Sequence, residues 1–114
     1  MKVGVCIICL LLSLKAYSSE RDYQNMYCIG AMEVVMPDRS RADCVTETHA
    51  IEYDFASKWK EAVGQSLNYA MHTGKRAGIV LILEKKKDLR YLDQLNRLIK
   101  HYLLPIDVWV VPVS

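Results

Sequence analysis

The chain has 114 residues, with 15 Lys and Arg against 13 Asp and Glu and a formal net charge of +2. This length accommodates one ordinary globular domain and excludes two. The charged fraction of 25% and the small numbers of Pro (3) and Gly (5) are those of a folded protein, not of a disordered or fibrous chain. The net charge is too small for a protein that coats a polyanion through its overall field.

The first 18 residues are typical of an export signal. Lys2 provides a short positive start, residues 3–14 form an almost unbroken apolar run, and residues 16–18 place small side chains where a signal peptidase reads them. This run of 12 residues is shorter than the ~20 that a membrane-spanning helix needs. We therefore expect a signal peptide over residues 1–18 and a single domain over residues 19–114, with no stable membrane association after cleavage.

Removal of the signal changes the charge and the cysteine count. Residues 19–114 carry 13 basic and 13 acidic side chains, so the mature domain is formally neutral. Two cysteines remain, Cys28 and Cys44, and in an oxidising compartment we expect one disulfide that closes a loop of about 16 residues. The alternative is two separate buried thiols. In the chain-entropy treatment such a bond contributes roughly 3 kcal/mol.

The hydrophobic pattern predicts alternating helices and strands. Residues 20–30 predict a short helix, and residues 32–36, 41–46 and 50–55 predict strands, the first two joined by a turn at 37–40. The remaining predicted elements are a helix over 57–73 that Ser57 caps and Gly74 ends, a strand over 77–83, a helix from Asp88 to before Pro105, and a strand over 106–111. This order predicts an α/β or α+β domain of three layers with an antiparallel hairpin at one side.

Acidic residues occur in two of the predicted strands. Side chains on a strand alternate between its faces, so Glu52 and Asp54 share one face of strand 50–55. Asp43, near the middle of the preceding strand, converges with them if the two strands pair. Oxygen-only clusters of this kind suit Mg²⁺ or Mn²⁺. The alternative is a solvated sheet face on which Glu52 and Asp54 bind nothing.

The helix that follows favours a functional site. Besides its apolar stripe it carries a second stripe at spacings of three and four, formed by Lys58, Glu61, Gln65 and Tyr69. A helix that only packs on a sheet rarely carries such an ordered polar set.

These motifs resemble the PD-(D/E)XK nuclease superfamily, which has the restriction-endonuclease-like fold. There a strand with Asp is followed by a strand with Glu-x-Lys and a helix with Gln-x-x-x-Tyr. The matching segments here are Arg41-Ala42-Asp43, Ile51-Glu52-Tyr53-Asp54 and Gly64-Gln65-Ser66-Leu67-Asn68-Tyr69. The resemblance spans residues 23–111 and implies a three-layer αβββαβ core, here with an extra C-terminal helix and strand.

The resemblance also implies an activity and roles for single residues. Asp43 and Glu52 would ligate Mg²⁺ or Mn²⁺ together with the Tyr53 carbonyl, and Gln65 and Tyr69 would orient the nucleic-acid backbone or the attacking water. The implied reaction is hydrolysis of a phosphodiester bond in nucleic acid. The metal lowers the pKa of a bound water and neutralises charge on the phosphoryl oxygens.

One position departs from the superfamily pattern. The lysine expected two residues after Glu52 is Asp54. Phosphodiester hydrolysis needs a cation near the attacking water, and Lys58, which faces the same way as Gln65, is the candidate for a migrated lysine, with Lys60 as the second. If neither reaches the site, Asp54 is an extra metal ligand or the site is inactive.

Two functions of different classes follow. The first is an exported, metal-dependent phosphodiesterase that acts on nucleic acid. The second is a catalytically inactive binding or interaction module of the same fold in the periplasm or extracellular space, which Asp54 and the neutral mature charge favour. A third hypothesis, an effector or immunity-type partner of another exported protein, has no residue for or against it. The sequence leaves DNA or RNA, endo- or exonuclease mode, and oligomeric state open.

Other polar and aromatic residues are assigned structural places. Asp38, in the predicted turn, is expected to bond its own backbone and not a metal. The three histidines lack zinc-ligand spacing with cysteine and are assigned to the surface or to helix ends. Trp59 and Trp109 occupy apolar stripes and are expected in the core.

Overall fold

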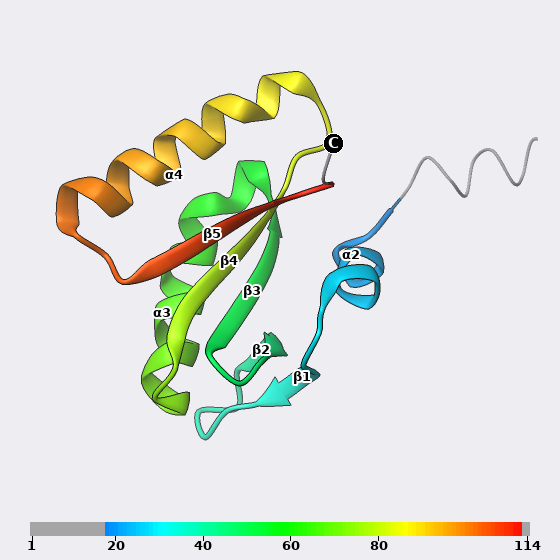
Figure 1. Cartoon of the computed structure of the whole chain (residues 1–114), viewed down its shortest axis with the longest axis vertical. Helices are drawn as coiled ribbons and strands as arrows, with labels where there is room; N and C mark the ends of the chain where they lie inside the picture. Colours follow the sequence, from blue (N-terminus) through cyan, green and yellow to red (C-terminus); the bar gives the residue numbers. More distant parts are fainter. Residues whose placement is uncertain (1–17, 113–114) are drawn as a thin grey trace, which may run out of the picture.

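The structure is a computed structural model that describes residues 18–112 (Figure 1). Its elements are α2 (Glu20–Tyr27), β1 (Ala31–Val35), β2 (Arg41–Val45), β3 (His49–Phe55), the 3₁₀ turn η1 (Ala56–Lys58), α3 (Trp59–Thr73), β4 (Arg76–Ile82), the 3₁₀ turn η2 (Lys86–Asp88), α4 (Leu89–Tyr102) and β5 (Ile106–Val111). The predicted order of helices and strands is confirmed. The predicted signal peptide lies outside the described residues except for Ser18.

The five strands form one mixed sheet in the order β1-β2-β3-β4-β5. β1, β2 and β3 are joined by antiparallel pairing, whereas β3, β4 and β5 run parallel to one another. Parallel neighbours need a crossover connection, and α3 and α4 provide the two crossovers. Residues 18–112 therefore form an α+β domain with a five-stranded mixed sheet and three helices.

Helices lie on both faces of the sheet. α3 and α4 pack on one face, where the largest core cluster includes Trp59, Ile79, Leu81 and Leu95. α2 lies on the other face (Figure 1), where Tyr23 and Tyr27 pack against a cluster that includes Ile51, Tyr53, Val80 and Ile82. The strand β4 is buried along nearly its whole length, as expected for the continuous apolar run between two covered faces.

The helix ends follow local chemistry. α2 begins with a capping box in which Ser19 Oγ accepts from Asp22 N at 3.2 Å and Asp22 Oδ2 accepts from Ser19 N at 2.9 Å. The predicted cap at Ser57 is wrong, because the chain makes the tighter turn η1 first and α3 begins at Trp59 without a side-chain cap. Gly74 ends α3 at φ 70°, the left-handed conformation that glycine adopts without steric cost.

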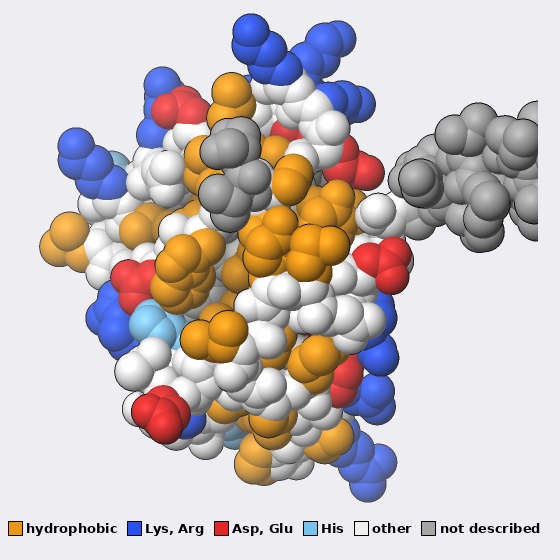
Figure 2. All heavy atoms as spheres, turned by 45° about the vertical axis from the view of Figure 1, so that its right-hand side comes forward, with side chains coloured by type: hydrophobic (Ala, Val, Ile, Leu, Met, Phe, Trp, Pro, Cys, Tyr) orange, Lys and Arg blue, Asp and Glu red, His pale blue; other side chains and the backbone are white. Residues whose placement is uncertain are grey.

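Two surface features differ from expectation. Trp59 is buried, but Trp109 is 43% exposed, because β5 is an edge strand and α2 does not reach over it. Tyr102 and Leu103 at the end of α4 are also exposed. Hydrophobic side chains gather on the face beside α2 (Figure 2), where the sheet is only partly covered.

The predicted disulfide is confirmed. Cys28 and Cys44 are bonded, with their Cα atoms 5.9 Å apart. The bond ties the end of α2 to β2 and is compatible with an exported protein. Between residues 18 and 112 no helix combines the length and the apolar character that crossing a bilayer requires.

Gly30, between α2 and β1, is a point of close backbone approach. A Cβ atom there would lie 2.1 Å from the Val45 carbonyl oxygen of β2, and because that atom belongs to backbone it cannot move aside by a rotamer change. We expect Gly30→Ala to destabilise the protein by about 2–4 kcal/mol in urea unfolding.

Gly64 provides the matched control for Gly30. It lies in the interior of α3, where a Cβ atom would meet nothing within 4 Å. Gly64→Ala should stabilise the protein by roughly 0.5–1 kcal/mol, since alanine loses less conformational entropy in a helix. Equal effects of the two substitutions would contradict the close approach at Gly30.

Candidate functional site

An acidic cluster forms where β2 and β3 part. The two strands pair only at Cys44 and Val45, opposite Ile51 and Ala50. At the next position Asp43 turns its side chain to β3, and its Oδ2 accepts from the backbone N–H of Tyr53 at 2.7 Å. The carboxylate thus replaces a strand-to-strand bond, which holds Asp43 at the fork between the strands.

Glu52 faces Asp43 across this fork. Its side chain is buried, with 6% exposed, and its carboxyl lies in hydrogen-bonding contact with that of Asp43. Burial, and then the bond and negative charge of Asp43, raise the pKa of Glu52 to about 10. Glu52 therefore keeps its proton at neutral pH, and burial raises the pKa of Asp43 as well. The Oε1 atom of Glu52 has no hydrogen-bond partner among the described residues.

Asp54 lies two residues farther along β3 on the same face and is 4% exposed. Burial, followed by a hydrogen bond to the Glu20 carboxyl and the charge of Glu20, raises its pKa to about 7. The positive charge of Lys58 opposes this rise. Lys58 itself is exposed and forms no ion pair within residues 18–112.

One residue of α2 that the sequence analysis missed, Glu20, belongs to this cluster, and a second, Gln24, lies buried on the same helix. Glu20 contacts Asp54, and Gln24, one turn later on α2, is 3% exposed with an Oε1 atom that has no partner in the described part of the chain. Glu20 and Gln24 are four residues apart, so the sequence indicates that they share one face of the helix. Only the packing of α2 on the sheet shows that this face meets β3.

Tyr69 and Gln65, the two helix residues of the motif, differ in position. Tyr69 is buried, its ring packs against Ala42 and Ala50, and its hydroxyl contacts Glu52. Burial and the negative charges of Glu52 and Asp43 raise the pKa of Tyr69, so it stays protonated. Gln65, one turn earlier on α3, is exposed and makes no side-chain hydrogen bond with the described residues.

The donors of the cluster are all oxygen atoms, from the carboxyls of Asp43, Glu52, Asp54 and Glu20. This set matches the ligand preference of Mg²⁺ and Mn²⁺. As the side chains stand, no three Asp, Glu, His or Cys residues of the described chain are grouped closely enough to hold an ion. The free oxygens of Glu52 and Gln24 nonetheless lack the partner that a buried polar atom requires.

The predicted turn residue Asp38 takes no part in the cluster. Its Oδ1 accepts from Ser40 N at 2.9 Å and its Oδ2 accepts from Asn68 at 2.9 Å. This confirms the expectation that it bonds locally. Its carboxylate is held so well by these donors that its pKa lies far below the usual range.

His49 is more than a surface residue. Its Nε2 lies 2.6 Å from Asp107 of β5, and its Nδ1 lies 2.7 Å from the Thr48 hydroxyl. Asp107 also accepts from Arg76 of β4 at 2.8 Å. These contacts join the starts of three neighbouring strands, and the bonds from Arg76 and His49 lower the pKa of Asp107 to about 2.

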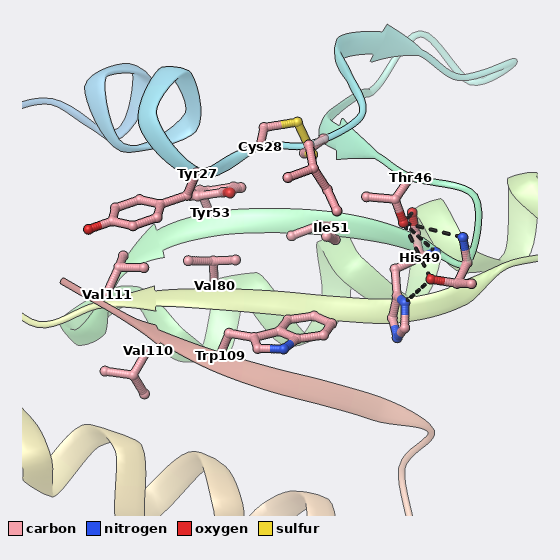
Figure 3. Close-up of a pocket in the computed structure, with 13 residues that line it drawn as sticks. Tyr27, Cys28, Thr46, His49, Ile51, Tyr53, Val80, Trp109, Val110 and Val111 are labelled. Carbon is pink, nitrogen blue, oxygen red and sulfur yellow. Dashed lines mark hydrogen bonds between the residues drawn. A yellow bond between two sulfur atoms is a disulfide. The ribbon is translucent and has the colours of Figure 1, made fainter. Parts of the chain in front are cut away.

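An apolar hollow of about 420 Å³ lies beside this network, on the side of the sheet that faces α2 (Figure 3). Tyr27 and the disulfide form one wall and Trp109 and Val111 of β5 form the other. Thr46 and His49 supply polar atoms at one end. However, Thr46 Oγ1 already bonds to the backbone of His49, and the His49 ring already contacts Thr48 and Asp107. The acidic cluster is therefore the better-equipped site for chemistry.

Comparison of the chain with protein-family models, with curated proteins and with solved structures gives no match in any of the three. The class to which the protein belongs is thus defined by its own fold and site: an α+β domain with a mixed five-stranded sheet, whose strands β2 and β3 part around a buried group of carboxyls.

Proposed function

We propose that the mature domain is an exported phosphodiesterase of the PD-(D/E)XK type, which uses Mg²⁺ or Mn²⁺ to cleave nucleic acid. The observation that carries the proposal is the meeting of Asp43 and Glu52 at the fork between β2 and β3, with one oxygen of Glu52 buried and without a partner. A buried carboxyl oxygen of this kind is a ready ligand for a cation.

The fold supports the proposal. The element order from α2 to β4 is the αβββαβ order that the resemblance implies, and α4 and β5 follow as the extra helix and strand. Asp43 stands on the second of these strands, Glu52 on the third and Tyr69 on the next helix. This is the motif order of the superfamily.

The residues divide the proposed chemistry among them. Asp43 and Glu52 would hold the metal, with the Tyr53 carbonyl and Asp54 as further ligands. The bound metal would supply a water of lowered pKa and neutralise charge on the phosphoryl oxygens. Tyr69, protonated near Glu52, would orient the nucleic-acid backbone or the attacking water.

The positive charge of Lys58 acts on Asp54 of the cluster. Because it is exposed and engaged in no ion pair within the described residues, it can approach an entering phosphate. Lys60 points to the neighbouring helix surface and lies 5.6 Å from the Trp59 ring centroid. We therefore propose Lys58 as the migrated lysine.

One observation favours a second candidate function, an inactive binding module of the same fold. Asp54 occupies the lysine position and bonds to Glu20, so the cluster carries a further carboxyl where the superfamily has a cation. If the excess negative charge repels phosphate more than a metal attracts it, the cluster binds an ion without cleaving nucleic acid.

Incubation of mature protein with single- and double-stranded DNA and RNA, with Mg²⁺ or Mn²⁺, tests the first function. We expect cleavage that falls by about 100-fold or more in Asp43→Asn and Glu52→Gln, because each substitution removes a metal ligand. Glu47→Gln, an exposed acid in the β2–β3 turn, is the matched control and should cleave normally.

Absence of cleavage by the unaltered protein, or cleavage that persists in both site variants, contradicts the phosphodiesterase. Titration with Mn²⁺ then separates the two functions. Binding without cleavage supports the binding module, and the absence of binding contradicts a metal site of either kind.

A further inference from the structure

A shallow groove of about 530 Å³ lies between the start of α3 and the C-terminal half of α4. These two helices lie on the same face of the sheet (Figure 1). The groove is open along its length, so it suits an extended polymer better than an enclosed small molecule. Its surface combines cationic and aromatic side chains.

The floor of the groove is rigid. Trp59 is 7% exposed, and its Nε1 donates to the Oε1 of Gln94 on α4 at 3.1 Å. This bond links the two helices across the groove. Lys60 sits over the Trp59 ring at 5.6 Å, an arrangement that keeps its ammonium group at the rim.

The opposite rim is also cationic. Arg97 of α4 pairs with Asp93 at 3.0 Å, but both side chains are largely exposed, so the pair is worth little and Arg97 can exchange its partner. His101 follows one turn later on the same rim, and its ring meets that of Tyr102 edge to face, with centroids 4.7 Å apart. Tyr102 is 66% exposed and presents a free aromatic surface.

The N-terminal end of α3 is the part of the chain that links the groove to the acidic cluster. Lys58, whose charge acts on Asp54, directly precedes the groove residues Trp59 and Lys60. α4 packs against the turn η1 that holds Lys58. A strand that reached from the cluster to the groove would therefore pass the N-terminal end of α3, where Lys58 lies.

We propose that this groove binds single-stranded nucleic acid and guides it to the acidic cluster. Cations that follow the phosphates, together with exposed aromatic rings on which bases stack, are the features of single-strand binding surfaces. In a duplex the faces of the bases are stacked on one another, so only the cations of the groove contribute to its binding. The direction toward the cluster rests on the proposed phosphodiesterase function, whereas binding in the groove does not.

Fluorescence anisotropy with a labelled single-stranded DNA and its duplex, in EDTA so that no cleavage occurs, tests the proposal on the mature protein. We expect the single strand to bind more tightly than the duplex. The double variant K60E/R97E should bind the single strand at least about 10-fold more weakly. The slope of log K against the logarithm of the salt concentration should also be shallower by about 1.4, because two phosphate contacts are lost. Tyr102→Ala should weaken binding by about 5-fold or more.

The matched control is R39E/R41E, which makes the same change of charge on the exposed β1–β2 hairpin. Equal losses in the two double variants, duplex binding as tight as single-strand binding, or no binding at all would overturn the proposal. Failure of the phosphodiesterase has a different signature: single-strand binding persists in EDTA and is lost in K60E/R97E, but no metal promotes cleavage.

Discussion

The stability of the metal-free protein is expected to fall as pH rises from about 5 toward 10. Glu52 has an ordinary pKa of 4.5, which burial and the adjacent Asp43 raise to about 10 in the folded protein. Between these values the folded protein keeps a proton that the unfolded chain has lost, so unfolding becomes more favourable at each step to higher pH. Asp54, with its pKa raised to about 7, adds to the loss in the lower half of this interval.

Glu52→Gln should remove most of the dependence of stability on pH. The amide has nearly the shape of the protonated carboxyl and does not titrate, so folding no longer requires the uptake of a proton above pH 4.5. We expect the variant to be more stable than the unaltered protein at pH 8 by roughly 2 kcal/mol, which is about 10 °C in Tm for a domain of this size. Thermal unfolding followed by circular dichroism in EDTA at pH 5, 7 and 9 measures both effects.

Added Mn²⁺ should make the unaltered protein more stable than Glu52→Gln at pH 8. A cation that binds the ionised carboxyls stabilises the folded state in proportion to the logarithm of its concentration above the dissociation constant. The unaltered protein should therefore gain stability with Mn²⁺ at pH 8, whereas Glu52→Gln should not. Stability of the metal-free protein that rises with pH, or an equal gain with Mn²⁺ in both proteins, would show that the cluster is not the proposed site.

Reduction of the disulfide is expected to weaken the acidic cluster as well as the fold. The bond ties Cys28, directly after α2, to Cys44 of β2, the residue next to Asp43, and Glu20 is the first residue of α2. Closing a loop of this length contributes about 3 kcal/mol in the chain-entropy treatment. We expect reduction to lower the free energy of unfolding by about this amount and to weaken Mn²⁺ binding, since α2 then leaves the cluster.

Urea unfolding and Mn²⁺ titration of the mature protein, with and without a phosphine reductant, measure the two effects. The variant C28A/C44A should behave as the reduced protein does, and the reductant should not change it further. Intact mass with and without reduction before alkylation verifies the bond. Unchanged Mn²⁺ affinity after reduction would show that α2 contributes nothing to the cluster.

Local patterns in the sequence predict most of the secondary structure. The alternation in 50–55, the apolar run in 77–83 and the left-handed stop at Gly74 each reflect a preference within a few residues of chain, and the structure confirms them. The predicted bond between Cys28 and Cys44 is also confirmed, because two cysteines allow only one pairing. Ser57 failed as a cap because a 3₁₀ turn satisfies the backbone there.

The site was predictable only in part. Asp43, Glu52 and Tyr69 come together as the motif order indicated, and Asp54 lies beside them on β3. Gln65 shares the helix and the spacing but lies exposed on α3. A spacing of four residues places Gln65 and Tyr69 on the same side of the helix. Which of them meets the sheet depends on how the apolar side chains of the helix pack.

The sequence by itself thus determined the order of the elements, the disulfide and the pair of acidic strands, since each follows from contacts between residues near in the chain or from an unambiguous pairing. The tertiary structure decided three further features. It parted β2 from β3 so that Asp43 could bond to Tyr53, it brought Glu20 of α2 to the cluster, and it left Trp109 exposed on an edge strand. These features depend on contacts between distant segments, and such contacts form only when the whole sheet packs against its helices.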